Sequence, residues 1–138
     1  MVVRAAICAI GLFLADAKEE QPGKEQFQLI AIEQNIISYT NAERQRYGLP
    51  PLEVDEKLVK SARRHCAWMT RNRTLTHTRQ PVAENIAMGQ RSSQEAVRDW
   101  MSSPGHRANI LNRGYRRIGV AAYRTATGTI YWCQQFLR

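Results

Sequence analysis

The C-terminal part of the chain contains two segments in which apolar residues alternate with their neighbours. The alternating positions are Ile118, Val120 and Ala122 in the first segment and Ile130, Trp132 and Gln134 in the second. A period of two residues is typical of β-strands, and Thr127-Gly128 between the segments is a turn sequence. We therefore expect an antiparallel hairpin, and helices elsewhere in the chain to cover it as layers of one domain.

Helical patterns account for most of the chain before this hairpin. Apolar residues recur at helical spacing from Leu29 to Tyr39 and predict a helix over residues 25–47, with Gly48 just after its end. Asp55 suits the N-cap of a second helix that ends near Arg71. A capping box at residues 92–95 opens a third helix, and a Ser-Pro pair at residues 103–104 opens a short fourth one. The sequence therefore predicts an α/β fold with a small antiparallel sheet.

The N-terminus has the pattern of a secretory signal peptide. An apolar stretch of 11 residues follows Arg4 and is too short to span a bilayer. Ala15-Asp16-Ala17 fits the small-x-small cleavage rule. We expect residues 1–17 to be removed, residues 18–26 to form a polar leader, and residues 27–138 to fold as one domain without a transmembrane segment. An ordinary amphipathic terminus is the alternative.

The chain is basic, and its charge is unevenly distributed. It carries 20 Lys and Arg against 12 Asp and Glu, a net charge of +8, and from Ser61 onward there are 13 basic and 3 acidic residues. No run of basic residues exceeds two, whereas a nucleic-acid module usually has a denser basic stripe. We expect an anionic extracellular surface rather than nucleic acid as partner; a solvated Arg-rich surface is the alternative.

The cysteine count is consistent with one disulfide. Removal of the signal peptide takes Cys8 with it and leaves Cys66 and Cys133. An even pair in an oxidising compartment predicts a bridge between them. Cys66 lies on the inward face of the second predicted helix and Cys133 on the last strand, so the bridge would join helix to sheet. Two buried free thiols are the alternative.

Three histidines and one glutamate are the candidates for chemistry. We expect His65, beside the apolar face of the second helix, to be half-buried and hydrogen-bonded. His77 follows the end of that helix, and His106 lies in the first turn of the fourth, where a helix N-terminus favours neutral imidazole. Glu84 lies in a segment without strong periodicity, where its carboxylate can face a cavity. The spacing matches no compact zinc signature, so surface polar residues are the alternative.

Several ordered motifs match a known family together. They are Asn41-Ala42-Glu43-Arg44, Leu75-Thr76-His77, Glu84-Asn85-Ile86-Ala87, the run from Trp100 to Leu111, the run from Tyr115 to Val120, and Tyr131-Trp132-Cys133-Gln134. The chain resembles the CAP superfamily (cysteine-rich secretory proteins, antigen 5 and pathogenesis-related 1), also called SCP domains, in its short secreted bacterial form. The resemblance covers about residues 29–136.

The resemblance implies a three-layer α-β-α sandwich with a central cavity. In many members this cavity holds two His and two Glu, which can bind zinc or another divalent ion. Carried over by motif, His77, Glu84 and His106 are three of the four residues, and the fourth position is Ser103 instead of a glutamate. Two His and one Glu can still form a three-ligand site with an open water position, whereas the hydroxyl can leave a metal-free cluster.

The function implied is that of a secreted or cell-envelope protein without a required cofactor. We expect non-catalytic binding of a lipid, a sterol or another extracellular ligand around the His/Glu cavity, because the missing fourth carboxylate weakens the case for an enzyme. The alternative is a hydrolase in which His77, Glu84 and His106 hold Zn²⁺ and an activated water. A structural or stress-related envelope protein is a third interpretation.

Overall fold

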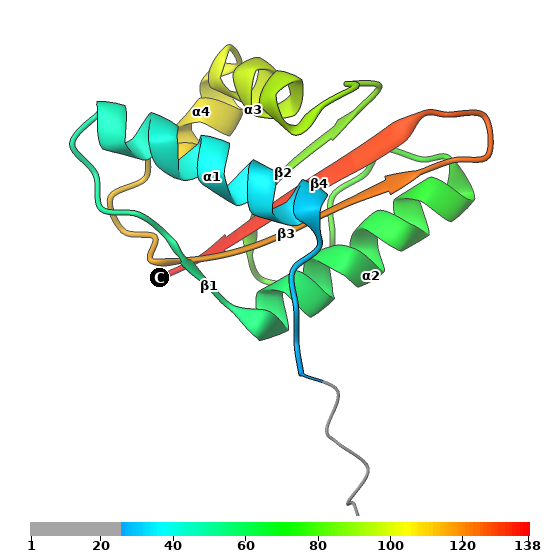
Figure 1. The fold of residues 1–138 in the computed structure, drawn as a ribbon, viewed down its shortest axis with the longest axis horizontal. Helices are drawn as coiled ribbons and strands as arrows, with labels where there is room; N and C mark the ends of the chain where they lie inside the picture. The colour runs from blue at the N-terminus through cyan, green and yellow to red at the C-terminus, as the bar shows by residue number, and fades with distance from the viewer. Residues whose placement is uncertain (1–25) are drawn as a thin grey trace, which may run out of the picture.

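A computed structural model describes residues 26–138, so the expected signal peptide and nearly all of the polar leader lie outside the described residues. The elements are α1 (Ala31–Arg46), β1 (Glu53–Val54), α2 (Glu56–Asn72), β2 (Ala83–Met88), α3 (Ser93–Met101), α4 (Pro104–Ile110), β3 (Arg117–Arg124) and β4 (Ile130–Leu137). The chain ends in the expected hairpin of β3 and β4 (Figure 1). Within residues 26–138, no helix has the length and apolar character needed to cross a membrane.

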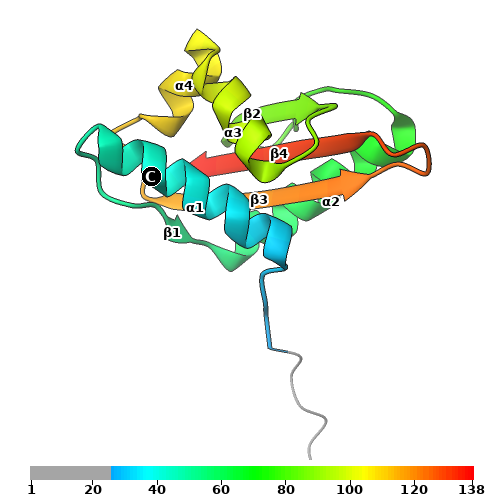
Figure 2. The ribbon, with the colours of Figure 1, turned by 45° about the horizontal axis from the view of Figure 1, so that its top comes forward.

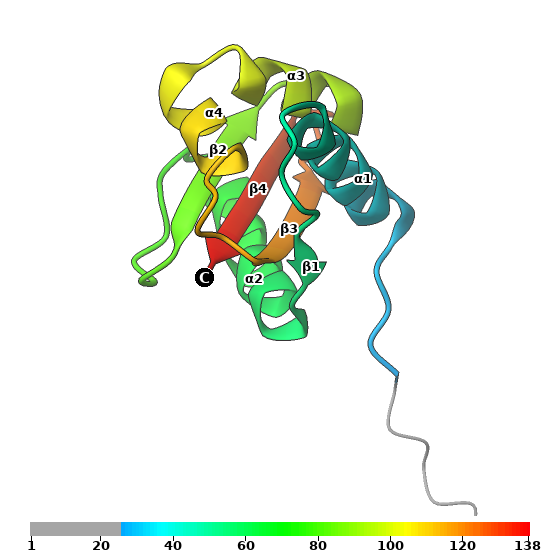
Figure 3. The same ribbon diagram turned by 90° about the vertical axis from the view of Figure 1, so that its left-hand side faces the viewer.

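One four-stranded sheet in the order β1-β3-β4-β2 separates two helical layers. Helix α2 covers one face, and α1, α3 and α4 lie on the other (Figures 2 and 3). The three-layer α-β-α sandwich is therefore confirmed. The sheet differs from the expected one in its short strand β1, which pairs parallel to β3. Strand β4 pairs antiparallel with both β2 and β3.

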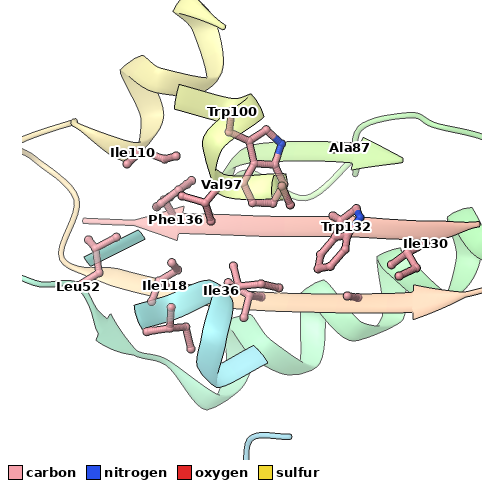
Figure 4. Close-up of a cluster of buried hydrophobic side chains, with 14 residues drawn as sticks. Ile36, Leu52, Ala87, Val97, Trp100, Ile110, Ile118, Ile130, Trp132 and Phe136 are labelled. Atoms are coloured by element: carbon pink, nitrogen blue, oxygen red, sulfur yellow. The ribbon is translucent and has the colours of Figure 1, made fainter. Parts of the chain in front are cut away.

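The alternation along the strands divides the buried side chains between the two faces of the sheet. Trp132 and Phe136 of β4 join Trp100 of α3 in the larger core beneath α1 and α3 (Figure 4). Tyr131 and Cys133 point the other way, into a smaller cluster with residues of α2. Because strand side chains alternate, each face of β4 belongs to a different core.

Local capping signals place most of the helix ends. The Asp55 carboxylate accepts the Leu58 N–H at 3.0 Å, and the Ser92 hydroxyl accepts the Glu95 N–H at 3.1 Å. Ser103 precedes α4 as expected, although its side chain forms no capping hydrogen bond. Gly48, just after α1, has φ +70°, a conformation that glycine adopts without strain.

Helix α1 starts six residues later than the apolar pattern predicts. Ile30 is still extended, and its N–H donates to the Glu33 carboxylate at 3.0 Å, which caps the helix at Ala31. The inward stripe also differs: Ile37 is buried, whereas Tyr39 is exposed. Spacing alone assigns Tyr39 to the apolar face, but its ring lies on the solvent side of the helix.

Candidate functional site

The candidate residues gather around β2, the edge strand that the sequence pattern did not reveal. Glu84 and Asn85 are consecutive in β2, so their side chains point to opposite faces of the sheet. Glu84 lies on the α2 side, opposite Gln135 of β4. Asn85 lies on the α4 side, where its side-chain amide donates to the backbone carbonyl of His106 at 3.0 Å. The edge strand thus connects the two helical layers.

The Glu84 carboxylate is buried and is surrounded by donors from its own chain. Its side chain is 2% exposed. Oε1 accepts from His77 Nδ1 and from the Thr78 N–H, both at 2.9 Å. Oε2 accepts from Gln135 Nε2 at 2.9 Å and from the Cys133 thiol at 3.5 Å. A carboxylate has about four lone-pair positions, so no position is left for an external ligand.

Glu84 orients the ring of His77. An ionised carboxylate can only accept, so His77 Nδ1 donates to it, and in the neutral ring the lone pair is then on Nε2. The His77 side chain is 61% exposed, so a ligand can approach this ring. This carboxylate–histidine arrangement is the one that fixes the tautomer of metal-binding and proton-accepting histidines.

His65 lies next to His77 and Glu84, and the sequence did not predict that it belongs to this site. It is half-buried and hydrogen-bonded, as the sequence indicated: Nε2 donates to the Thr76 carbonyl at 2.7 Å. The same nitrogen is 3.8 Å from Glu84 Oε1. His65 therefore joins α2 to the segment that carries His77. The sequence feature that could have indicated this is the position of His65 next to Cys66, on the flank of the helix that faces the sheet.

His106 approaches from the opposite layer, at the start of α4. A polar network holds this helix, because Asn109 donates to the Asn85 side chain at 2.9 Å. Burial and then the nearby His77 lower the pKa of His106, so its imidazole stays neutral at pH 7. Ser103, the other residue assigned to the cavity, is the half-buried residue just before α4.

The described residues give the predicted three-ligand metal set no direct support. Within residues 26–138, no group of three or more His, Cys, Asp and Glu side chains is arranged to hold a metal ion. His77 and Glu84 are in contact, but the carboxylate is occupied by the four donors. With its carboxylate occupied in this way, Glu84 is not free to act as the third protein ligand of a zinc site.

The predicted disulfide is likewise not formed in this structure. Cys66 and Cys133 are both free and buried, in one cluster between α2 and the sheet. Each thiol has its own acceptor, the Tyr131 carbonyl at 3.1 Å for Cys66 and the Glu84 carboxylate at 3.5 Å for Cys133. Burial raises the pKa of Cys66 to about 12 and raises that of Cys133 well above its ordinary value. Neither thiol is therefore a ready nucleophile.

An open groove of about 670 Å³ adjoins His77 on the α2 side. One wall consists of His65 and Trp68, whose rings are nearly parallel with centroids 6.2 Å apart. The segment after α2 contributes the other lining residues, Thr74, Thr76, Thr78 and Arg79, besides His77 itself. The groove was not predicted, because Thr76 and His77 lie in a matched motif but Trp68, Thr74 and Thr78 lie in none.

Comparison with known proteins shows which family the sequence matches. The sequence profile of the Cysteine-rich secretory protein family (CAP) matches residues 37–136. Uncharacterized protein YkwD of Bacillus subtilis is 39% identical over 124 residues, which is 78% of this chain and 47% of that protein. The chain therefore spans about half the length of this curated relative.

Two solved structures share the fold. An extracellular protein containing a SCP domain from Bacillus anthracis has a TM-score of 0.69 and 26% identity, over 82% of this chain and 45% of that chain. An outer surface protein from Borrelia burgdorferi has a TM-score of 0.69 and 23% identity, over 78% of this chain and 94% of that chain.

Proposed function

Because the chain belongs to the cysteine-rich secretory protein family, we propose that it is a secreted domain that binds an extracellular ligand and has no chemistry of its own. The ligand site is the exposed ring of His77 together with the adjoining groove. Secretion is proposed from the signal-like residues 1–17 and from extracellular relatives such as the Bacillus anthracis protein.

The observation that carries this proposal is the saturation of Glu84. If Glu84 itself acted as general base or metal ligand, its carboxylate would need a free lone pair facing the reacting atoms. Glu84 instead accepts from His77, from the Thr78 backbone and from two residues of β4. Its role is therefore to hold the His77 ring and the segment behind it in place.

Residues 26–138 also offer His77 no nucleophile. The one side chain with which His77 shares a hydrogen bond in this part of the chain is Glu84. Nucleophilic catalysis requires a hydroxyl or thiol hydrogen-bonded to the base, and the two buried thiols have raised pKa values. An oriented, solvent-facing imidazole without a nucleophile can still donate to or accept from a bound ligand.

The open shape of the groove favours a ligand with polar groups over a buried sterol or lipid tail. Apolar ligands occupy enclosed, predominantly hydrophobic cavities. This groove is open, and Trp68 is the one large apolar side chain among its lining residues, beside two histidines, three threonines and an arginine. A ligand that combines a ring face with hydroxyl or charged groups matches this surface.

Binding and hydrolysis can be separated with the full-length chain and two variants, His77→Gln and Trp68→Ala. We expect no turnover of p-nitrophenyl esters or of casein above the level of His77→Gln, with or without added Zn²⁺. In native mass spectrometry of the secreted protein, we expect a retained ligand that His77→Gln or Trp68→Ala loses. Turnover that requires His77 would overturn the proposal, and so would ligand retention indifferent to both substitutions.

A further inference from the structure

We propose that the groove beside His77 binds an anionic saccharide chain, with Trp68 as the stacking surface and Arg79 as the charged contact. This inference rests on the proposed binding function, since it names the ligand class of the same site. Three features carry it: an exposed aromatic wall, threonine hydroxyls that line the same groove, and an excess of basic side chains around it.

The aromatic wall is exposed and held in place. Trp68 is 42% exposed, although exposed tryptophans are uncommon on a small domain without a partner. The ring of His65 lies parallel to it within 7°, and the hydrogen bond from His65 to the Thr76 carbonyl keeps that ring in place. A preorganised flat surface of this kind suits the apolar face of a sugar ring, which loses little entropy on stacking.

Threonine hydroxyls also line the groove. Thr74, Thr76 and Thr78 come from the segment after α2 that carries His77 and Arg79. Hydroxyls both donate and accept, which matches the mixed donors and acceptors of a saccharide. A lipid bilayer would instead require several neighbouring apolar side chains, and Leu75 is the other exposed large apolar residue of this segment.

The charge around the groove selects an anion. Residues 57–83 contain seven Lys and Arg side chains and no Asp or Glu. Arg64 and Arg71 lie four residues before and three residues after Trp68 on α2, so they flank it on the exposed helix face. Arg79 lines the groove itself. Lys60 pairs with Glu56 and Arg63 with Glu33, and the Glu84 carboxylate beside the groove is buried. The exposed arginines that remain attract a polyanion and raise its local concentration.

The test uses tetragalacturonate, a chain of uronic-acid rings, with the full-length protein. Trp100 and Trp132 are buried, so a change in intrinsic fluorescence on titration reports on Trp68. We expect saturable binding that alters this fluorescence and weakens with added salt. The fully methyl-esterified tetramer retains the rings but loses the charges and should bind about tenfold more weakly. Inorganic polyphosphate retains charge without rings and should leave the fluorescence unchanged.

Calorimetry on variants identifies the contacts. Trp68→Ala should weaken tetragalacturonate binding about tenfold, and Trp68→Phe should restore part of the affinity. Arg79→Ala should weaken it by about threefold to tenfold. Arg113→Ala removes an exposed arginine between α4 and β3 and should change affinity less than twofold. Circular dichroism of each variant shows whether it is folded.

Several results would overturn the inference. One is that tetragalacturonate and polyphosphate bind equally well and that Trp68→Ala and Arg113→Ala bind them to the same extent. Charge alone would then explain the binding. Another is Trp68-dependent binding of single-stranded DNA or anionic lipid vesicles that exceeds binding of the saccharide. If no saccharide binds but a different ligand is lost from His77→Gln or Trp68→Ala, the proposed binding function stands and only the ligand class is wrong.

Discussion

Replacing Glu84 with glutamine tests whether this carboxylate organises the site. The substitution preserves the shape of the side chain but removes its charge and exchanges one acceptor oxygen for a donor. On the Oε1 side, the new amide oxygen can still accept from His77 and from the Thr78 N–H. On the Oε2 side, the new NH₂ group meets the NH₂ group of Gln135, which now donates at 2.9 Å. Two donors facing each other cannot both be satisfied.

The expected cost follows from these contacts. A hydrogen bond to a charged group contributes about 1.5–3 kcal/mol and a neutral one about 0.5–1.5 kcal/mol, so each of the three 2.9 Å bonds loses about 1 kcal/mol. Gln135 can rotate its amide, because its Oε1 is buried and has no partner in the described chain. That rotation and the relief of a buried charge offset part of the loss. We expect Glu84→Gln to lower the free energy of unfolding by about 2 kcal/mol.

Urea unfolding followed by circular dichroism measures this loss. With a typical slope of about 2 kcal/mol per M, the midpoint should fall by about 1 M at an unchanged slope. Nitrogen NMR of the imidazole rings supplies a second readout, since the neutral amide oxygen should hold the proton of His77 on Nδ1 less strongly than the carboxylate does. The control is Glu53→Gln, an exposed carboxylate on β1, which should change stability by no more than about 0.5 kcal/mol. A midpoint indistinguishable from this control, with the His77 tautomer unchanged, would refute the assigned role of Glu84.

Three further substitutions test the scaffold and its pH dependence. Arg44 is fully buried and donates to three backbone carbonyls at 2.8–2.9 Å, so Arg44→Met should cost about 3 kcal/mol in urea unfolding; a loss below about 1 kcal/mol would contradict this. A Cβ at Gly119 would overlap the backbone of Leu58, so Gly119→Ala should cost about 2 kcal/mol or more, and an unchanged melting temperature would show that α2 can shift freely. The pKa of His106 is lowered in the folded chain, so the unfolded chain binds the proton more readily and the free energy of unfolding should fall as pH drops below 6.5. With chelator present, the free energy of unfolding of His106→Gln should fall less over the same pH range. Parallel pH profiles for the two proteins would refute this.

The family motif around Arg44 has a structural explanation that its letters do not show. Asn41 accepts the Leu52 N–H at 2.8 Å and donates to the Leu52 carbonyl at 3.2 Å, which ties α1 to the segment before β1. Arg44 reaches carbonyls at the end of α4 and just beyond it. This motif therefore joins α1 to two distant parts of the chain, although none of its residues lies in the groove beside His77.

Local rules determined which segments are helices and where most of them start. Asp55, Ser92 and Gly48 act within one turn of their own helices, so their effect can be read from neighbouring residues. The C-terminal hairpin was equally readable, because alternation and a turn are short-range patterns. The recognised motifs added the layering and brought His77, Glu84 and His106 to notice.

Tertiary structure decided what those residues can do. Strand β2 escaped detection because residues 84–87 are all buried, which removes the alternation that marks a half-exposed strand. The donors around Glu84 come from the segment after α2 and from β4, up to 51 residues away in sequence. The groove of His65, Trp68 and the threonines likewise exists only where α2 and the segment after it lie together. Whether a carboxylate is free or saturated depends on contacts between distant segments, which no local pattern encodes.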